Sequence, residues 1–355
     1  MSIKIYEDTK IYIACPANVA TGGPKNLHQL AYHLRNDLKI DASMFYYNYN
    51  KMKYRSPVHG EYIHYSLPYI TNANKIEDDQ KNILIVPEIK SGLMLLNKYK
   101  KIRKGVWFLS VDNYYLSKQD FLIEKIINKI SKSIFKKPLT VFDMTSKKLL
   151  NQLIDKYNYR EDPLLKIVDF YLSQSYYALK FFRDLKPNYY VSDYLDEAYL
   201  RTTTDLAKKE NIVAYNPTKG CSFTAKLISR ARDIKFVPII NMKKEQVVKT
   251  LQKAKVYIDF GNHPGKDRIP REAAILDCCV ITGKRGSAAF FEDVSIPEEY
   301  KFEDTEKDIP KIIEKINDCF ENFEERNKDF EYYRKIIRNE PQKFIDDLKK
   351  IFIKV

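Results

Sequence analysis

The chain has 355 residues, of which 44% are hydrophobic and 30% are charged, and this composition is typical of a globular protein rather than a low-complexity scaffold. One hydrophobic core rarely serves a chain of this length, so the length predicts two domains. The formal net charge of +14 favours phosphate-bearing partners such as nucleic acid, anionic lipid or a nucleotide, although genome bias can account for part of the lysine excess.

The cysteines and the N-terminus indicate a cytoplasmic protein. The five cysteines form no CxxC pair, which argues against a disulfide framework and a zinc site and favours a reducing compartment. The opening stretch lacks the apolar region of a signal peptide, and no window reaches the ~18 apolar residues of a membrane span. We therefore expect a soluble, cytoplasmic protein.

The first half of the chain alternates predicted strands and helices. Apolar residues predict a strand at 10–15, and leucines at helical spacing predict a helix over 27–38. Further strands are expected at 42–47, 82–87, 105–111, 166–172 and 188–192, and helices at 121–136 and 146–157.

The pattern starts again after a short linker near residues 193–209. Strands are expected at 211–215, 235–240, 256–260 and 278–282, and helices at 223–232, 244–254, 271–277, 309–323 and 340–352. Two successive series of this kind predict two doubly wound α/β domains. Because such sheets bind ligands beyond the carboxyl ends of their strands, the residues that follow strands are the candidates for a site.

Two candidate positions lie in turns after predicted strands. Gly22 and Gly23 precede the first helix, where backbone amides and the helix N-terminus favour a phosphate, although a glycine pair equally serves as a plain turn. Lys219 follows the strand at 211–215 and has an exposed turn lysine as its simpler interpretation. Neither GxGxxG nor a Walker loop is present.

The loop after the strand at 256–260 carries the strongest signal. Lys266, Arg268 and Arg271 fall within six residues, and arginine gives a bidentate grip on phosphate oxygens. Glu272 follows at the start of the next helix, where a carboxylate can hold ribose hydroxyls or merely complement the helix dipole. A second loop, GKRGS, ends at Ser287 and can add amides and cations.

These segments resemble the group 1 type of GT-B fold glycosyltransferases. The stretch TGGPKNLHQLAYHL is similar to the family's GGxxxxxxxLAxxL opening, and NIVAYNPTKG is similar to its first C-terminal strand and KG turn. The stretch PREAAILDCCVITGKRGSAAFFED resembles its LPxLEAMAxGxPVVAxxxGGxxE segment, with Glu272 at the glutamate of LEAMA. Variants such as HPGKDRIPRE resemble bacterial capsule and O-antigen transferases.

The resemblance implies two Rossmann-like domains that face each other across a cleft. The N-terminal domain, residues 1–200, would bind the acceptor, and residues 201–330 would bind the nucleotide sugar. A C-terminal helix, residues 331–355, would pack back on the N-terminal domain. The implied reaction moves a sugar from a nucleotide-sugar donor, with UDP or GDP favoured, to a glycan or lipid-linked acceptor in bacterial surface polysaccharide synthesis.

The resemblance also implies chemistry without a metal or another cofactor, and the sequence has no DxD triplet. Cations would then stabilise the departing diphosphate. The donor set would be Gly22, Gly23, Lys219, His263, Lys266, Arg268, Arg271, Glu272 and Ser287, with Lys266 and Arg271 also catalytic. The chain departs from the family at Gly265, where an acidic residue usually stands, so His263 and Asp267 are the candidates for its sugar contact.

Candidates on the acceptor side are Glu88 and Asp112, which follow the strands at 82–87 and 105–111. An inverting enzyme would need one of them as a general base, whereas a retaining one would not. His28 is a weaker candidate and is more simply a histidine on a helix face.

Residues 121–137, FLIEKIINKISKSIFKK, form a basic amphipathic pattern. Such a helix either contacts the inner face of the membrane or packs on a core with a solvated lysine face. Alternatives to a transferase are a GT-B epimerase, a non-catalytic GT-B-like partner and a nucleic-acid-binding protein. The last is disfavoured because no RNP, zinc-finger or bZIP motif is present, so we expect no nucleic-acid partner.

Overall fold

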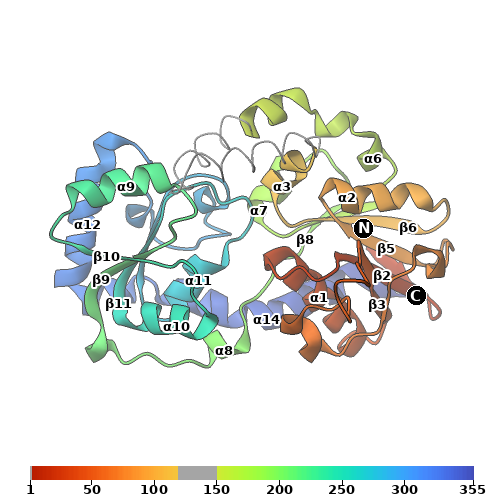
Figure 1. Cartoon of the computed structure of the whole chain (residues 1–355), viewed down its shortest axis with the longest axis horizontal. Coiled ribbons are helices and arrows are strands. Elements are labelled where there is room, and N and C mark those ends of the chain that lie inside the picture. The colour runs from red at the N-terminus through yellow and green to blue at the C-terminus, as the bar shows by residue number, and fades with distance from the viewer. Residues whose placement is uncertain (1, 119–149) are drawn as a thin grey trace. The chain divides into compact units, whose positions relative to one another are not determined.

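The computed structural model describes residues 2–118 and 150–355, and the chain divides into two compact units (Figure 1). Of the described residues, unit 1 contains 2–118, 153–193 and 342–355, and unit 2 contains 150–152 and 194–341. The basic stretch at 121–137 lies outside the described residues.

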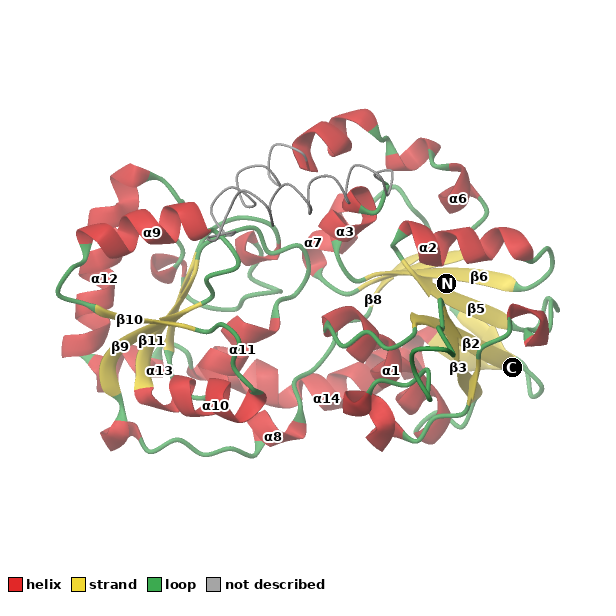
Figure 2. Cartoon of the chain, in the orientation of Figure 1, coloured by secondary structure: helices red, strands yellow, loops and turns green. Residues whose placement is uncertain are grey.

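Unit 1 is built on a parallel sheet, whose strands are drawn in yellow in Figure 2. The sheet has seven strands in the order β4-β3-β2-β5-β6-β7-β8. Its central strands are buried on both faces, as the continuous apolar runs predict. The strands are β2 (Lys10–Pro16), β3 (Asp41–Tyr47), β4 (Tyr69–Ile70), β5 (Ile83–Pro87), β6 (Arg103–Phe108), β7 (Phe170–Ser173) and β8 (Asn188–Tyr190). The helices include α1 (Gly22–Asn36), α2 (Lys90–Leu93), α3 (Val111–Leu116), α6 (Pro163–Lys166) and α7 (Tyr176–Phe181).

Unit 2 has a four-stranded parallel sheet with the order β10-β9-β11-β12. The strands are β9 (Glu210–Tyr215), β10 (Lys235–Pro238), β11 (Ala254–Asp259) and β12 (Cys279–Thr282). The helices are α8 (Glu197–Leu200), α9 (Cys221–Arg230), α10 (Lys244–Lys253), α11 (Arg268–Ile275), α12 (Ile309–Glu321) and α13 (Phe323–Lys328). Parallel strands alternating with helices confirm the predicted α/β class.

Each sheet has one point at which the strand order reverses. In unit 1 the chain starts at β2, extends to β3 and β4 on one side, and then continues from β5 on the other side. In unit 2 it starts at β9, adds β10, and resumes at β11 on the opposite side. Loops after neighbouring strands diverge at such a point, and the crevice they leave is where open α/β sheets bind ligands.

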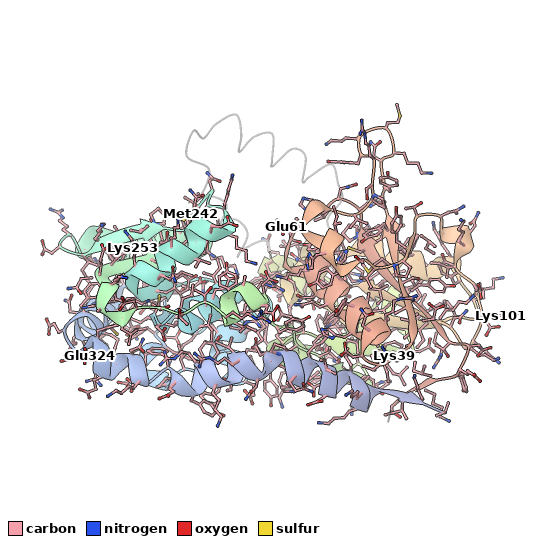
Figure 3. All side chains as sticks on the ribbon, turned by 90° about the horizontal axis from the view of Figure 1, so that it is seen from below. Lys39, Glu61, Lys101, Met242, Lys253 and Glu324 are labelled. Carbon is pink, nitrogen blue, oxygen red and sulfur yellow. The ribbon has the colours of Figure 1, made fainter. Side chains whose placement is uncertain are left out.

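The last helix, α14 (Glu331–Ile351), leaves unit 2 at Pro341 and continues into unit 1 (Figure 3). It is followed by β13 (Phe352–Lys354), which pairs in parallel with β1 (Ile3–Ile5). The end of the chain therefore belongs to unit 1.

Some predicted boundaries differ from the structure. The helix expected over 271–277 is α11, which begins at Arg268, because Pro270 is tolerated in a first turn where its missing N–H is not needed. The strand expected over 166–172 is reduced to β7, and α6 occupies the residues before it. Within the described residues, no helix is both long and apolar enough to cross a bilayer.

A buried lysine holds the core of unit 2 together. The Lys209 Nζ donates hydrogen bonds to the carbonyl oxygens of Leu251 (2.9 Å), Ala254 (2.8 Å) and Leu276 (2.6 Å). These carbonyl oxygens lie in α10, in β11 and in the turn after α11, so one ammonium group is hydrogen-bonded to three separate segments of unit 2.

We predict that Lys209→Met destabilises unit 2 by about 3 kcal/mol, because buried carbonyl oxygens lose their donor. Lys208→Met is the matched control, since the Lys208 side chain is 81% exposed. Chemical denaturation of both variants measures the difference. Equal stability of the two variants would show that the buried ammonium contributes nothing net.

Candidate functional site

Three loops at the carboxyl edge of the unit 2 sheet meet through glycines. A Cβ at Gly220, which has φ +56°, would lie 1.3 Å from the Phe260 carbonyl oxygen. A Cβ at Gly261 would lie 2.7 Å from the Gly220 nitrogen, and one at Gly286, with φ +61°, would lie 2.1 Å from the His263 carbonyl oxygen. The loops after β9, β11 and β12 are thus in backbone contact that any side chain would prevent.

Lys219 and Arg268 are the predicted cations that remain within reach of solvent in unit 2. Lys219 follows β9, and its side chain is 27% exposed and forms an ion pair with Asp267. Arg268 is half-buried at the first position of α11. Asp267 is the N-cap residue of α11, so Lys219 lies beside the start of that helix.

Lys266 and Arg271 are instead buried around Glu340 of α14. The Lys266 Nζ lies 2.8 Å from Glu340 Oε1, and Arg271 Nη1 donates to Glu340 Oε2 at 2.8 Å. The Arg271 Nε also donates to the carbonyl oxygen of Asp267 at 3.2 Å. Arg271 is fully buried, so in this structure it holds the loop instead of presenting its guanidinium to a ligand.

His263 is likewise fully buried, between two carboxylates. Its Nε2 lies 3.5 Å from Asp259 Oδ1 and its Nδ1 lies 3.1 Å from Asp267 Oδ2. Burial disfavours the imidazolium, but the charges of Asp259 and Asp267 outweigh it and raise the pKa of His263. With no exposed surface, His263 can fix Asp267, and through it Lys219, but cannot itself contact a sugar in this state.

Glu272 and Ser287 are the remaining members of the predicted donor set in unit 2. Glu272 is half-buried on α11 and faces the Tyr199 hydroxyl of α8. Burial, followed by the charge of Glu272, raises the pKa of Tyr199. The Ser287 hydroxyl is buried and donates to the Gly265 carbonyl oxygen at 2.6 Å, so it braces the loop between β11 and α11.

Gly22 and Gly23 open α1 at the point where the unit 1 sheet reverses its strand order. A Cβ at Gly22 would meet no atom within 4 Å, and one at Gly23 would lie 3.4 Å from Leu109 Cδ1. The first turn of α1 contains no acidic residue, and Thr21 gives no side-chain cap. The helix N-terminus is therefore open and electropositive.

Glu88 follows β5 on the other side of the same reversal. Its carboxylate is buried and accepts a hydrogen bond from the Leu109 N–H at 3.1 Å. Burial raises the pKa of Glu88 to about 7, although backbone hydrogen bonds oppose the shift. The group can thus accept or release a proton near neutral pH.

Asp112 lies in the first turn of α3, shortly after Leu109, and is half-buried. Burial, followed by the charge of Asp112, raises the pKa of Tyr177, which locates the two side chains near each other. Glu88 and Asp112 are therefore held by the same segment after β6.

His28 is a packed histidine on α1. Its Nδ1 lies 2.6 Å from the Pro24 carbonyl oxygen, its Nε2 lies 2.7 Å from the Tyr46 hydroxyl, and its ring stacks on Tyr62. Burial lowers the pKa of His28 to about 4, so the ring is neutral at physiological pH. These contacts match the simpler interpretation of His28 as a helix-face residue.

Two polar pairs were not found by sequence reasoning. Glu340 lies 69 residues after its partner Arg271, and no local pattern in the sequence signals such a pairing. In unit 1, the buried Gln174 donates from Nε2 to Asp193 Oδ1 at 2.8 Å, which links the loops after β7 and β8. Only their positions just after predicted strands could have suggested Gln174 and Asp193.

Among the described residues, no group of three or more histidine, cysteine, aspartate or glutamate side chains is arranged to hold a metal ion. The polar groups at the two sheet edges instead comprise ion-paired cations in unit 2 and buried acids in unit 1. This arrangement can bind anions at the unit 2 edge and transfer a proton at the unit 1 edge.

Comparisons with known proteins agree with the fold. No protein family matches the sequence, and no curated protein matches it. Anabaena HepE, solved in complex with UDP-glucose, is similar at a TM-score of 0.58 and 10% identity, with 96% of this chain and 99% of that chain covered. Sucrose-phosphate synthase from Thermosynechococcus elongatus is similar at 0.56 and 12% identity, with 95% of each chain covered.

BGT of phage T4, solved in complex with its UDP-glucose substrate, is similar at a TM-score of 0.52 and 10% identity, with 97% of this chain and 99% of that chain covered. These matches span nearly the whole chain at low identity, and they establish its fold. The chain has the GT-B fold of two Rossmann-like domains.

We predict that Glu340→Gln destabilises the protein by about 3–5 kcal/mol, because removal of one partner leaves buried charge without compensation. The exposed Glu324, labelled in Figure 3, supplies the control variant Glu324→Gln. Thermal and urea unfolding of both variants test this expectation, which fails if the two lose equal stability.

Glu88 gives a prediction for pH dependence. Its pKa is higher in the folded protein, about 7, than the ordinary glutamate value of 4.5, so its contribution to stability is present at low pH and is lost as the pH rises through 7. Between about pH 5 and pH 8, the wild type should lose about 3 kcal/mol relative to Glu88→Gln.

Urea unfolding at several pH values measures this difference for Glu88→Gln and for a control, Glu61→Gln, which alters an exposed side chain. A stability difference between wild type and Glu88→Gln that stays constant with pH would contradict the raised pKa.

Proposed function

We propose that the protein is a metal-independent glycosyltransferase, which transfers a sugar from a nucleotide-sugar donor to a glycan or lipid-linked acceptor. The observation that carries the proposal is the glycine-dependent meeting of the loops after β9, β11 and β12, with Lys219 and Arg268 beside them. The meeting occurs where the strand order reverses, which is the position that α/β sheets use for nucleotides.

The donor diphosphate would bind between Lys219 and Arg268, close to the N-termini of α9 and α11. Both side chains are partly exposed, and helix N-termini favour phosphate oxygens. Lys219 would leave Asp267 for the phosphate as the donor enters. Glu272, half-buried on α11, would accept hydrogen bonds from the ribose hydroxyls.

Lys266 and Arg271 would assist at a distance from the phosphate. Because Glu340 neutralises part of their charge, they would stabilise the developing diphosphate mainly by fixing the loop that carries Arg268 and by their residual field. Ser287 and His263 would keep the same loop in place through Gly265 and Asp267. These preorganised cations would take the place of a metal ion at the leaving group.

The acceptor hydroxyl would lie near Glu88 and the open N-terminus of α1. With a pKa of about 7, Glu88 could remove the proton from the attacking hydroxyl of an inverting reaction once acceptor binding exposes its buried carboxylate. The half-buried Asp112 is the second candidate base. A retaining reaction would use neither as a base, and loss of Glu88 would then affect acceptor binding instead.

The cellular role we propose is bacterial surface polysaccharide synthesis, as in capsule or lipopolysaccharide, at the cytoplasmic face of the inner membrane. Two observations support it: the resemblance of the loop HPGKDRIPRE to transferases of this type, and a net charge of +14, which suits an anionic membrane.

The donor class can be tested by thermal shift with UDP, GDP, CDP and CMP. We expect a nucleoside diphosphate, UDP first, to raise the melting temperature, because a ligand at a hundredfold Kd stabilises the folded state by about 2.7 kcal/mol. The shift should persist in EDTA.

Lys219→Gln and Glu272→Gln should each weaken binding about tenfold or more, because each removes a charged hydrogen-bonding group. Lys226→Gln, a change on the exposed side of α9, is the control and should bind normally. The proposal fails if no nucleotide stabilises the protein, or if Lys219→Gln and Lys226→Gln bind it equally.

A further inference from the structure

Hydrogen bonds within the turn that follows β3 fix the conformation of its backbone. The Asn50 side-chain oxygen accepts from the N–H groups of Met52 (3.0 Å) and Lys53 (3.2 Å), and its carbonyl oxygen accepts from Lys53 and Tyr54. The Tyr49 hydroxyl donates to the Tyr54 carbonyl oxygen at 2.9 Å. We call residues 49–55 the basic turn.

The side chains of the basic turn combine an apolar tip with positive charge. Met52 is 100% exposed, and Tyr54 is 38% exposed. Lys51, Lys53 and Arg55 flank them, are exposed, and form no ion pair with any other described residue. Residues 42–60 contain no aspartate or glutamate, so no nearby acid in the sequence offsets these charges.

A partner that covers the fully exposed Met52 gains free energy, because it removes an apolar side chain from water. Nucleic acids and other hydrophilic polyanions would engage the cations but would gain nothing from Met52. A bilayer surface satisfies both features, because the apolar side chain enters the interface while the basic groups meet anionic headgroups. In the 3₁₀ segment that follows, Ile63 is 62% exposed and adds a second apolar contact.

We propose that the basic turn is a docking surface for an anionic lipid bilayer. The residues that directly follow the basic turn connect it to the candidate acceptor edge of unit 1. Asn18 Nδ2 donates to the Ser56 carbonyl oxygen at 2.8 Å, and the Tyr62 hydroxyl donates to the Thr21 carbonyl oxygen at 3.0 Å. The membrane-bound turn is thus fastened to the loop that leads into Gly22.

This attachment bears on the substrate class, a step that rests on the proposed function. A soluble glycan does not require the unit 1 edge to lie at a membrane, whereas a lipid-linked acceptor does. The basic turn therefore favours an acceptor carried on lipid, with its sugar presented at the bilayer surface near the N-terminus of α1.

Vesicle co-sedimentation of the full chain tests the docking surface. The vesicles are phosphatidylcholine alone, or phosphatidylcholine mixed with phosphatidylglycerol in equal parts. We expect binding to the mixed vesicles, weakened by added salt. Each basic residue at such a surface contributes about fivefold, so the combined variant Lys51→Gln, Lys53→Gln, Arg55→Gln should bind about 100-fold more weakly. Met52→Ser should also reduce binding, although it leaves the charge of the basic turn unchanged.

The control neutralises Lys98, Lys100 and Lys101, three exposed lysines that precede β6, and leaves the same net charge as the test variant. Figure 3 shows Lys101 well away from Glu61, which lies in the segment after the basic turn. The control should bind the mixed vesicles as the wild type does.

The proposal is overturned if the wild type ignores the mixed vesicles, if the test variant still binds them, or if test and control variants lose binding equally. It is also overturned if a polyanion such as RNA is retained through the basic turn while the vesicles are not. The UDP thermal shift of the test variant should equal that of the wild type. If UDP shifts the melting temperature of neither the wild type nor the two variants, the transferase function is rejected. Vesicle binding would still test the docking surface in that case.

Discussion

The close approach of two backbone segments in unit 2 is the constraint on which the candidate donor site depends. The turn at Gly220 packs against the Phe260 carbonyl oxygen at a distance that excludes even a Cβ. Lys219 is therefore held beside the loop that begins at Gly261, and the start of α9 is held beside the start of α11. A substitution at Gly220 would separate these loops, and with them the only pair of partly exposed cations that we assign to the phosphate.

Buried charge makes the same loop rigid. Glu340 joins Lys266 and Arg271, and His263 joins Asp259 and Asp267. The Glu340 cluster places opposite charges in contact, so it leaves no desolvated ion alone, and in the other cluster the two carboxylates raise the pKa of His263. Because the loop is braced at both ends, Arg268 and the α11 N-terminus need little rearrangement to meet an anion, and such preorganisation is what electrostatic catalysis requires.

The sequence predicts the position of the site better than the state of its residues. Apolar runs locate the strands, and loops after strands then locate Lys219, Glu88 and the 261–268 segment, because parallel strands bring their carboxyl ends to one edge. The sequence does not show which of the cationic side chains are buried. In the sequence, Arg271 and Lys266 cannot be told apart from Arg268 as candidate phosphate ligands. In the structure they are buried against Glu340, and only the tertiary fold brings this residue of α14 to that loop.

The two units follow one topological rule and reach different chemistry with it. In each unit, glycine or a cation follows the first strand, which is β2 in unit 1 and β9 in unit 2. A segment that carries candidate site residues follows the neighbouring strand on the other side of the reversal, which is β5 in unit 1 and β11 in unit 2. In unit 2 the second segment carries cations, whereas in unit 1 it carries Glu88, whose burial raises its pKa to about 7. A positive edge suits a departing diphosphate, and a weak acid near neutrality suits an attacking hydroxyl. An inverting transfer uses both, and the proposed assignment of donor to unit 2 and acceptor to unit 1 follows from this difference in charge.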